Sequence, residues 1–198
     1  VSGASAQATV TNCTFHEPVV SGEGVRFQIG ASGTVSNCQF SNESMGVNAE
    51  SPGSVAVTDC LSEESVYGIR LANSNASITN NTFRHSGTGA TTRFPFWEWG
   101  SSEPTYTNNT LEGTTWKAVY ADGTIGQDQV WEDIQGDADW EYAPAGVTVT
   151  AGHTLTIPAG QVVKFASGGA LIVRGALDVQ ATAGAPVYFT SFKDDTVG

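Results

Sequence analysis

The sequence is poor in positive charge: 8 lysines and arginines stand against 20 aspartates and glutamates in 198 residues, so the net charge is −12 at pH 7. A field of that sign repels phosphate groups, which excludes binding of nucleic acid by charge neutralisation. Long apolar runs are also missing, because no stretch approaches the roughly 18 residues of a membrane-spanning helix. We therefore expect no nucleic-acid partner and no membrane span.

Residues that favour helices are scarce as well. The chain has 6 leucines and 1 methionine, whereas glycine and threonine each occur 23 times. Hydrophobic residues still make up 39% of the chain, which is enough for a packed core. Because threonine and glycine are typical of strands and turns, the composition predicts an all-β protein.

A six-residue motif occurs five times in the first 120 residues. Its third position is Asn or Asp, at positions 12, 37, 59, 80 and 108, so successive copies lie 25, 22, 21 and 28 residues apart. A Gly-Val/Ile motif follows the first three copies at Gly24, Gly46 and Gly68, with weaker counterparts near Gly89 and Ala118. Two short strands per repeat of this length predict one coil of a parallel β-solenoid.

The repeat also predicts where its side chains point. The first residue faces inward, the Asn or Asp takes the bend in left-handed backbone, and the residue after it faces inward on the next strand. Equivalent side chains of stacked coils then form ladders about 4.8 Å apart. Buried Asn can bond the turn backbone, whereas Cys fills the space as a small apolar group. The predicted inner ladder is Cys13, Cys38, Cys60, Asn81 and Asn109.

The three cysteines cannot all pair within one chain. They lack a CxxC spacing and no His accompanies them, so structural packing is favoured over a metal or redox site. One disulfide between adjacent coils stays open as an alternative, because adjacent coils are close enough for it.

The motif Ile/Val-Thr-Asn-Asn/Cys-x-Phe, followed by Gly-Val/Ile, resembles the degenerate repeat of the right-handed parallel β-helix proteins of bacterial cell surfaces and polysaccharide-acting enzymes. The resemblance covers residues 8 to about 121. It implies an all-β, right-handed parallel β-helix of the pectate-lyase-like superfold. The family includes lyases, tailspikes, adhesins and inert stalks, so the fold alone assigns no function.

The pattern changes after Asp122-Gly123. Residues 125 to 144 are acidic and aromatic, and we interpret them as an irregular connection or cap. Alternation resumes at Val147 and predicts roughly two more coils. The segments Leu-Thr-Ile-Pro-Ala-Gly-Gln-Val-Val-Lys-Phe at 155–165 and Pro-Val-Tyr-Phe-Thr-Ser at 186–191 follow in order. With them, residues 131 to 198 resemble the opening coils of large bacterial β-helix proteins. The sequence therefore predicts coils over 1–124, and a connection plus opening-type coils over 125–198.

The coils over residues 1–124 are thus of the type that ends a β-helix, and those over 125–198 are of the type that begins one. This order predicts a coil face with unpaired strand edges at each end of the chain. Val10 and Phe15 of one copy are expected to stack on Val187 and Phe189 of the next. Such a head-to-tail contact does not close, and it grows a filament. The alternative is an excised piece of a longer protein, with its two parts packed side by side.

Catalytic residues would lie at outward positions. Arg26 and Arg70 share a repeat position two coils apart and form a predicted outer basic strip about 10 Å long. The lyase-like members of the family use such a face, with Ca²⁺ and a basic residue that abstracts a proton. No acidic Ca²⁺ set accompanies this strip, so we interpret the arginines as solvated and paired with Glu23, Glu50 or Asp59. We predict no enzyme, with a polysaccharide lyase as the alternative.

Two further segments are candidate sites. The aromatic residues Phe94, Phe96, Trp97 and Trp99 interrupt the repeat, and either bury against the solenoid or a second copy, or form a stacking platform for a cell-surface glycan.

Asp194 and Asp195 are the second segment, a weak Ca²⁺ site. Ca²⁺ prefers six to eight oxygens, so a neighbouring subunit would have to complete this one.

The sequence as a whole predicts a non-catalytic, extracellular or cell-surface structural module of a prokaryote that assembles with itself. The main alternative is a glycan-binding or lyase-like fragment of a larger β-helix surface protein. An ice-binding solenoid would need a flat Thr-x-Thr array, of which Thr148, Thr150, Thr154 and Thr156 form only a short piece.

Overall fold

The computed structural model describes residues 1–17, 22–84, 94–113, 116–131, 134, 141–194 and 196–197. These residues form strands, turns and bends, and no helix among them is long and apolar enough to cross a membrane. The chain divides into two compact units. The first comprises Val1–Trp97 and Ser102–Lys117, and the second comprises Glu98–Ser101 and Ala118–Gly198.

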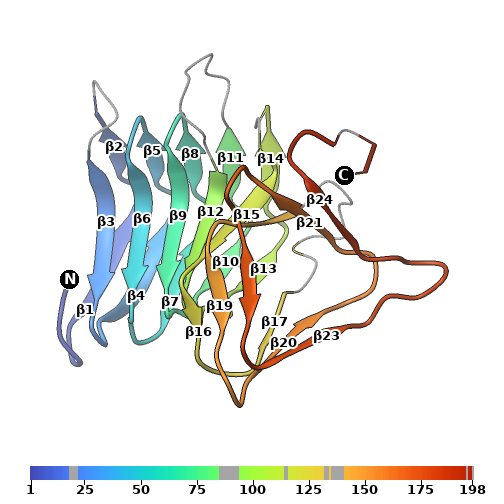
Figure 1. Ribbon diagram of the computed structural model, residues 1–198. Coiled ribbons are helices and arrows are strands. Elements are labelled where there is room, and N and C mark those ends of the chain that lie inside the picture. The colour runs from blue at the N-terminus through green and yellow to red at the C-terminus, as the bar shows by residue number, and fades with distance from the viewer. Residues whose placement is uncertain are drawn as a thin grey trace. The chain divides into compact units, whose positions relative to one another are not determined.

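The first unit is a stack of coils that builds three parallel sheets (Figure 1). One sheet has the order β1 (Gln7–Thr11), β4 (Ser32–Ser36), β7 (Val55–Thr58), β10 (Ser77–Thr79) and β13 (Thr105–Thr107). A second contains β2 (Thr14–His16), β5 (Gln39–Ser41), β8 (Leu61–Glu63), β11 (Thr82–Arg84) and β14 (Thr110–Glu112). The third contains β3 (Glu23–Gln28), β6 (Met45–Glu50), β9 (Tyr67–Ala72) and, as far as Trp97, β12 (Phe94–Trp99).

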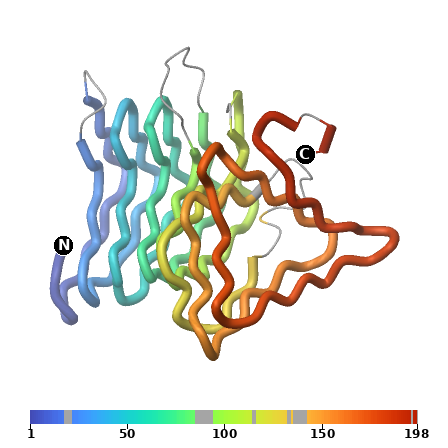
Figure 2. The backbone as a smooth tube through the Cα atoms, in the orientation of Figure 1, coloured from blue at the N-terminus to red at the C-terminus, as the bar shows by residue number. Residues whose placement is uncertain are grey.

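The second unit winds in the same way, as the tube in Figure 2 shows. Its sheets contain β16 (Thr124–Ile125), β19 (Val147–Val149) and β22 (Leu171–Val173), then β17 (Gln129–Val130), β20 (Thr154–Ile157) and β23 (Ala176–Val179). The third contains β15 (Ala118–Asp122), β18 (Glu141–Pro144), β21 (Val162–Phe165) and β24 (Tyr188–Ser191).

The irregular connection expected over residues 125–144 is corrected in part, because the regular strands β17 and β18 lie inside this segment. Residues 132–133 and 135–140 of the segment lie outside the described residues. Trp131 and Tyr142 of this segment belong to the core. Trp131 is 1% exposed and stacks on the buried Tyr142, with ring centroids 4.6 Å apart and planes 4° from parallel. The two coils predicted from Val147 onward are present as β19–β21 and β22–β24.

The bends between the first two sheets lie where the repeat predicts them. Asn12, Asn37, Asp59, Asn80 and Asn108 all have left-handed backbone, with φ between 52° and 56°. Asn and Asp adopt this conformation at lower cost than other non-glycine residues. The recurring Asn or Asp therefore sets the same corner in each coil.

Close packing requires the glycine of the Gly-Val/Ile motif. A Cβ on Gly24 would lie 2.5 Å from the Phe40 ring, and one on Gly68 would lie 2.4 Å from the Phe83 ring. Both distances are too short for any side chain. The glycine column therefore leaves room for the aromatic column of the second sheet.

The inner ladder lies beside the bends. Cys38, Cys60, Asn81 and Asn109 are buried, whereas Cys13 is exposed, contrary to the prediction. Cys13 differs because its coil forms the edge of the first two sheets, so it is covered from one side only.

Hydrogen bonds run along this ladder. Oδ1 of Asn81 accepts from the Cys60 N–H at 2.9 Å, and Nδ2 donates to the Val57 carbonyl at 3.0 Å. Oδ1 of Asn109 accepts from the Asn81 N–H at 2.9 Å. The Cys60 thiol takes the same acceptor position for the Cys38 N–H at 3.5 Å. The ladder cysteines are therefore more than apolar filling, since they occupy the hydrogen-bonding position of asparagine.

Replacing Asn81 tests the ladder. We expect Asn81→Ala to lower the free energy of unfolding by about 3 kcal/mol, because it leaves a buried N–H and a buried carbonyl without partners. Asn81→Cys introduces the residue found at this position in the preceding coils, and it should lower the free energy of unfolding clearly less than Asn81→Ala does. Urea denaturation followed by circular dichroism measures both. Equal losses for the two variants would contradict this account.

Candidate functional site

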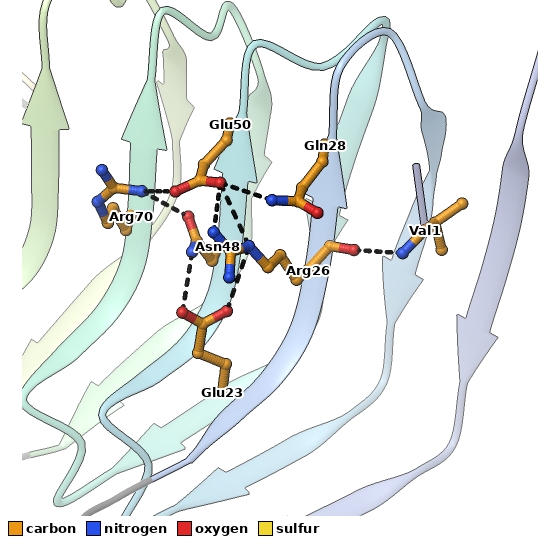
Figure 3. Close-up of polar contacts among 7 residues, drawn as sticks. All are labelled: Val1, Glu23, Arg26, Gln28, Asn48, Glu50 and Arg70. Atoms are coloured by element: carbon orange, nitrogen blue, oxygen red, sulfur yellow. Dashed lines mark hydrogen bonds and ion pairs between the residues drawn. The ribbon is translucent and has the colours of Figure 1, made fainter. Parts of the chain in front are cut away.

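A cluster of charged and polar side chains covers the outer face of β3, β6 and β9 (Figure 3). Arg26, Asn48 and Arg70 lie in register on these strands, which brings the predicted basic strip together. Acidic residues and a glutamine flank the row. We call this set the Glu50 cluster: Glu23, Arg26, Gln28, Asn48, Glu50 and Arg70.

Glu50 is the centre of the cluster. Its carboxylate accepts hydrogen bonds from Arg26, from Gln28 at 3.0 Å and from Arg70 at 2.6 Å. These bonds, above all the one from Arg26, lower the pKa of Glu50 to about 2. Glu50 therefore stays ionised at neutral pH and has little capacity to act as a general acid or base.

The remaining polar groups of the cluster also bond to one another. Asn48 is 1% exposed, donates to Glu23 at 3.1 Å and accepts from Arg70 at 3.0 Å. Of the expected carboxylate partners, Glu23 and Glu50 pair with the arginines. Asp59 accepts from the Thr58 hydroxyl at the bend instead.

Arg70 is also less solvated than expected, whereas the Arg26 side chain remains 43% exposed. The Arg70 side chain is 14% exposed, and its guanidinium lies 4.6 Å from the centre of the Trp97 ring. Such stacking favours a cation that has lost part of its water. The basic strip is therefore a neutralised network and not an open positive surface.

The aromatic segment is a regular strand, β12, and not an interruption of the coil. Phe94 and Phe96 are buried in the core, and Phe96 meets Phe83 edge-on with ring centroids 4.7 Å apart. Trp97 packs against Tyr67 on the outside at 4.8 Å. A platform of four exposed aromatic rings is therefore wrong, because the two phenylalanines face inward. The extra length of this repeat lies before β12, at residues 85–93, outside the described residues.

The predicted Ca²⁺ pair is only half described, because Asp195 lies outside the described residues. Asp194 accepts hydrogen bonds from the hydroxyl of Thr190 at 2.6 Å and from the N–H of Thr196 at 3.0 Å. These bonds lower the pKa of Asp194 to about 2. In the described part of the chain, no group of three or more His, Cys, Asp or Glu side chains could hold a metal ion.

The predicted assembly residues lie at coil edges. Val10 and Phe15 are half-buried, and Phe15 stacks on Phe40 with ring centroids 4.9 Å apart. Val187 is half-buried and Phe189 is 44% exposed.

Sequence analysis missed most of the face to which Phe189 belongs. The inward positions of β22–β24 are partly exposed, and each is in register with a buried residue one coil earlier. The inward residues of β22 and β23 could have been identified from the sequence, because they continue the alternation of apolar residues seen in β19 and β20. We call this set the open coil face: Leu171, Val173, Leu177, Val179 and Phe189.

A second missed feature is the uncharged outer face of the sheet of β1, β4, β7, β10 and β13, whose five strands contain no Asp, Glu, Lys or Arg. Two columns of outward side chains run across it in register. They are Thr9, Thr34, Ala56, Ser77 and Thr105 in one, and Thr11, Ser36, Thr58, Thr79 and Thr107 in the other. We call them the hydroxyl face. The expected piece at residues 148–156 forms no such array, because β19 and β20 lie in different sheets.

The Glu50 cluster predicts a pH-dependent contribution to stability. Glu50→Gln should cost about 1 kcal/mol at pH 7, since the charge-assisted bonds are partly exposed to solvent. The folded pKa of about 2 lies below the ordinary 4.5, so this contribution is complete above about pH 4.5 and is lost as the pH falls toward 2. Urea denaturation between pH 7 and pH 2 should show the gap between wild type and variant closing in that window.

Glu112→Gln is the control, because the Glu112 side chain is 48% exposed and pairs with the likewise exposed Arg84. It should change the free energy of unfolding by less than about 0.5 kcal/mol. A gap for Glu50→Gln that stays constant down to pH 2 would refute the electrostatic account.

Comparison with known proteins identifies the family to which the coils over residues 1–126 belong. No curated protein and no solved structure matches the chain. Residues 1–126, well over half of the 198, match the family described as the right handed beta helix region. With its parallel coils and left-handed bends, the chain belongs to the right-handed β-helix family.

Proposed function

We propose that this chain is a non-catalytic structural module of a prokaryotic cell surface, which assembles head to tail by stacking coil ends. The open coil face carries the proposal. Val173, Leu177 and Phe189 are 40%, 37% and 44% exposed, whereas their register partners in the preceding coil are fully buried. The sequence therefore provides core residues for a coil that is covered from one side only.

The directions of the strands favour the opposite end of a second copy as the occupant. All strands of a β-helix run the same way around its axis, so one coil continues another in parallel only when head meets tail. Two identical coil faces would meet with antiparallel strands and mirrored cross-sections. At the other end of the chain, β1 and β2 are the edge strands of their sheets and offer two edges to such a stack, while the edge of β3 pairs with Val1 and Ser2 of its own chain.

The expected strength follows from the exposed area. Completing the burial of the four side chains that are 37–44% exposed, Val173, Leu177, Val179 and Phe189, contributes about 2–5 kcal/mol. Association costs about 4–15 kcal/mol in lost freedom of motion, so hydrogen bonds along the strand edges must contribute the rest. Assembly should therefore depend on concentration.

The Glu50 cluster supports a role without catalysis, because its carboxylates and arginines already bond to one another. An uncharged Thr- and Ser-rich face suits a solvated extracellular surface. A glycan, if one binds, would meet Trp97 and Trp99 and not the full aromatic segment.

Val173→Asp tests the stack, with Ile172→Asp as the matched control. The two residues are adjacent and similarly exposed, at 40% and 46%, but Val173 faces the coil interior and Ile172 faces out. We expect Val173→Asp to abolish concentration-dependent assembly in sedimentation velocity and electron microscopy, because it buries a charge in the contact. Ile172→Asp should assemble like wild type.

Mixing the proteins tests the direction of stacking. A Val173→Asp copy keeps its N-terminal coil, so it should add to wild-type ends and shorten the filaments. An isologous contact between two open coil faces would leave it unable to add. A wild-type protein that stays monomeric at millimolar concentration would overturn the proposal.

A second candidate function is ice binding, which the hydroxyl face favours. Nine of its ten positions are Thr or Ser, with Ala56 as the exception. In-register strands space these side chains about 4.8 Å apart between coils and about 6.7 Å apart along a strand. Both spacings are close to repeats of the oxygen lattice on a prism face of ice.

Thr34→Tyr and Ser41→Tyr test this candidate. Both positions are half-buried and outward, but Thr34 lies in the hydroxyl face and Ser41 lies in β5 of the second sheet. Thr34→Tyr should abolish ice shaping and thermal hysteresis, because its ring holds the face away from the lattice, while Ser41→Tyr should not. Wild-type protein without thermal hysteresis would rule ice binding out.

A further inference from the structure

The three cysteines form one row along the axis of the first unit. The Gln39 N–H donates to the Cys13 carbonyl and the Leu61 N–H donates to the Cys38 carbonyl, both at 2.9 Å, so each cysteine lies beside the next. Neighbouring parallel strands are about 4.8 Å apart. That spacing lies inside the range of about 4.4–6.8 Å between the Cα atoms of disulfide-bonded cysteines.

The thiols also share one orientation. Each Sγ lies 3.3 Å from the carbonyl oxygen two residues before it, so the three side chains point the same way. Cys38 Sγ also lies 3.7 Å from the Val10 carbonyl, which places it toward the coil that contains Cys13. Cys60 Sγ lies 3.7 Å from the Val35 carbonyl in the same way, so the thiols are stacked alike, and a Cys13–Cys38 bond needs rotation of the Cys13 side chain toward Cys38.

Accessibility differs along the row and selects the pair. All three cysteines line a groove of about 670 Å³ on the outside of the bends. Cys13 is exposed, so its side chain can rotate toward Cys38 without disturbing the core. Cys38 and Cys60 are both buried, so an oxidant meets Cys13 first, and Cys38 is the cysteine that lies beside it. Burial also raises the pKa of Cys60 to about 11, which disfavours its thiolate at neutral pH.

We propose that Cys13 and Cys38 are a disulfide-forming pair that clamps the first coil of the β-helix to the second, while Cys60 stays a thiol. The oxidant is a small-molecule disulfide such as oxidised glutathione. The Cys13 thiolate attacks one sulfur of the oxidant and releases one glutathione thiolate, which leaves a mixed disulfide. The Cys38 thiolate then attacks Cys13 Sγ, the protein disulfide forms, and the second glutathione leaves as a thiolate. Both protein thiol protons pass to solvent.

The first coil is where a clamp has the largest effect. Val10 and Phe15 are only half-buried there, whereas Val35 and Phe40, the same positions one coil later, are 0% and 2% exposed. Edge elements with few buried contacts open more readily than core elements. A covalent link between the first two coils opposes that opening, and oxidising compartments outside the cell would supply the conditions for it. This inference does not depend on the proposed assembly.

The test treats reduced, folded protein with oxidised glutathione, then counts free thiols after denaturation and maps disulfides by mass spectrometry. Wild type should retain one free thiol, and Cys60→Ser should retain none. Cys13→Ser should form no internal disulfide, so that Cys38 and Cys60 are each either a free thiol or a mixed disulfide with glutathione. Oxidation should slow hydrogen exchange of the β1 and β2 amides in wild type and in Cys60→Ser, but not in Cys13→Ser.

Three results would overturn the proposal. They are a Cys38–Cys60 disulfide in wild type or in Cys13→Ser, a Cys13–Cys13 bond between two copies as the main product, and no protein disulfide at all. If oxidation leaves the exchange of β1 and β2 unchanged, the clamp is refuted even though the bond forms.

Discussion

The structure of the first unit depends on one constraint, the return of the chain to the same left-handed corner in every coil. Asn12, Asn37, Asp59 and their later counterparts hold this corner with nearly equal φ angles. Once the corner is fixed, each strand lies in register with its predecessor, and the inner side chains align. The ladder of Asn81 and Asn109 then bonds the N–H groups that the corner turns inward. Sheets, core and outer faces all follow from that alignment.

The same alignment explains what could be predicted from the sequence. The corner residues and the inward alternation have a local signature, so the coils, the bends and the buried ladder positions could be assigned from spacing and residue type. The later coils were predicted for the same reason, because Val147–Val149 and Thr154–Ile157 alternate clearly. The coil before them was missed, because Trp131 and Tyr142 lack a regular alternation and reveal their role only when their rings stack.

Features that depend on neighbouring coils were harder to predict. The repeat register placed Arg26 and Arg70 on one face with Glu23 and Glu50 as partners, but it did not show that the single carboxylate of Glu50 binds both arginines. The hydroxyl face also forms only across coils, since each strand contributes only two of its side chains. Phe94 and Phe96 were placed in a segment that interrupts the repeat, because four aromatic residues among six positions hide the alternation of inward and outward side chains. Cys13 was placed in the core because a repeat alone does not show which coil lies at the edge.

Unequal repeats that return to the same corner have a further consequence. A spacing of 21 residues and one of 28 both bring the chain back to an Asn in left-handed backbone. A difference in repeat length therefore does not shift the register of later coils, because each coil returns to the same corner. Extra residues placed between a second-sheet strand and the following third-sheet strand do not shift any later coil. Such a scaffold can accept foreign peptides at these connections as separate side loops, each displayed at a height set by the number of its coil.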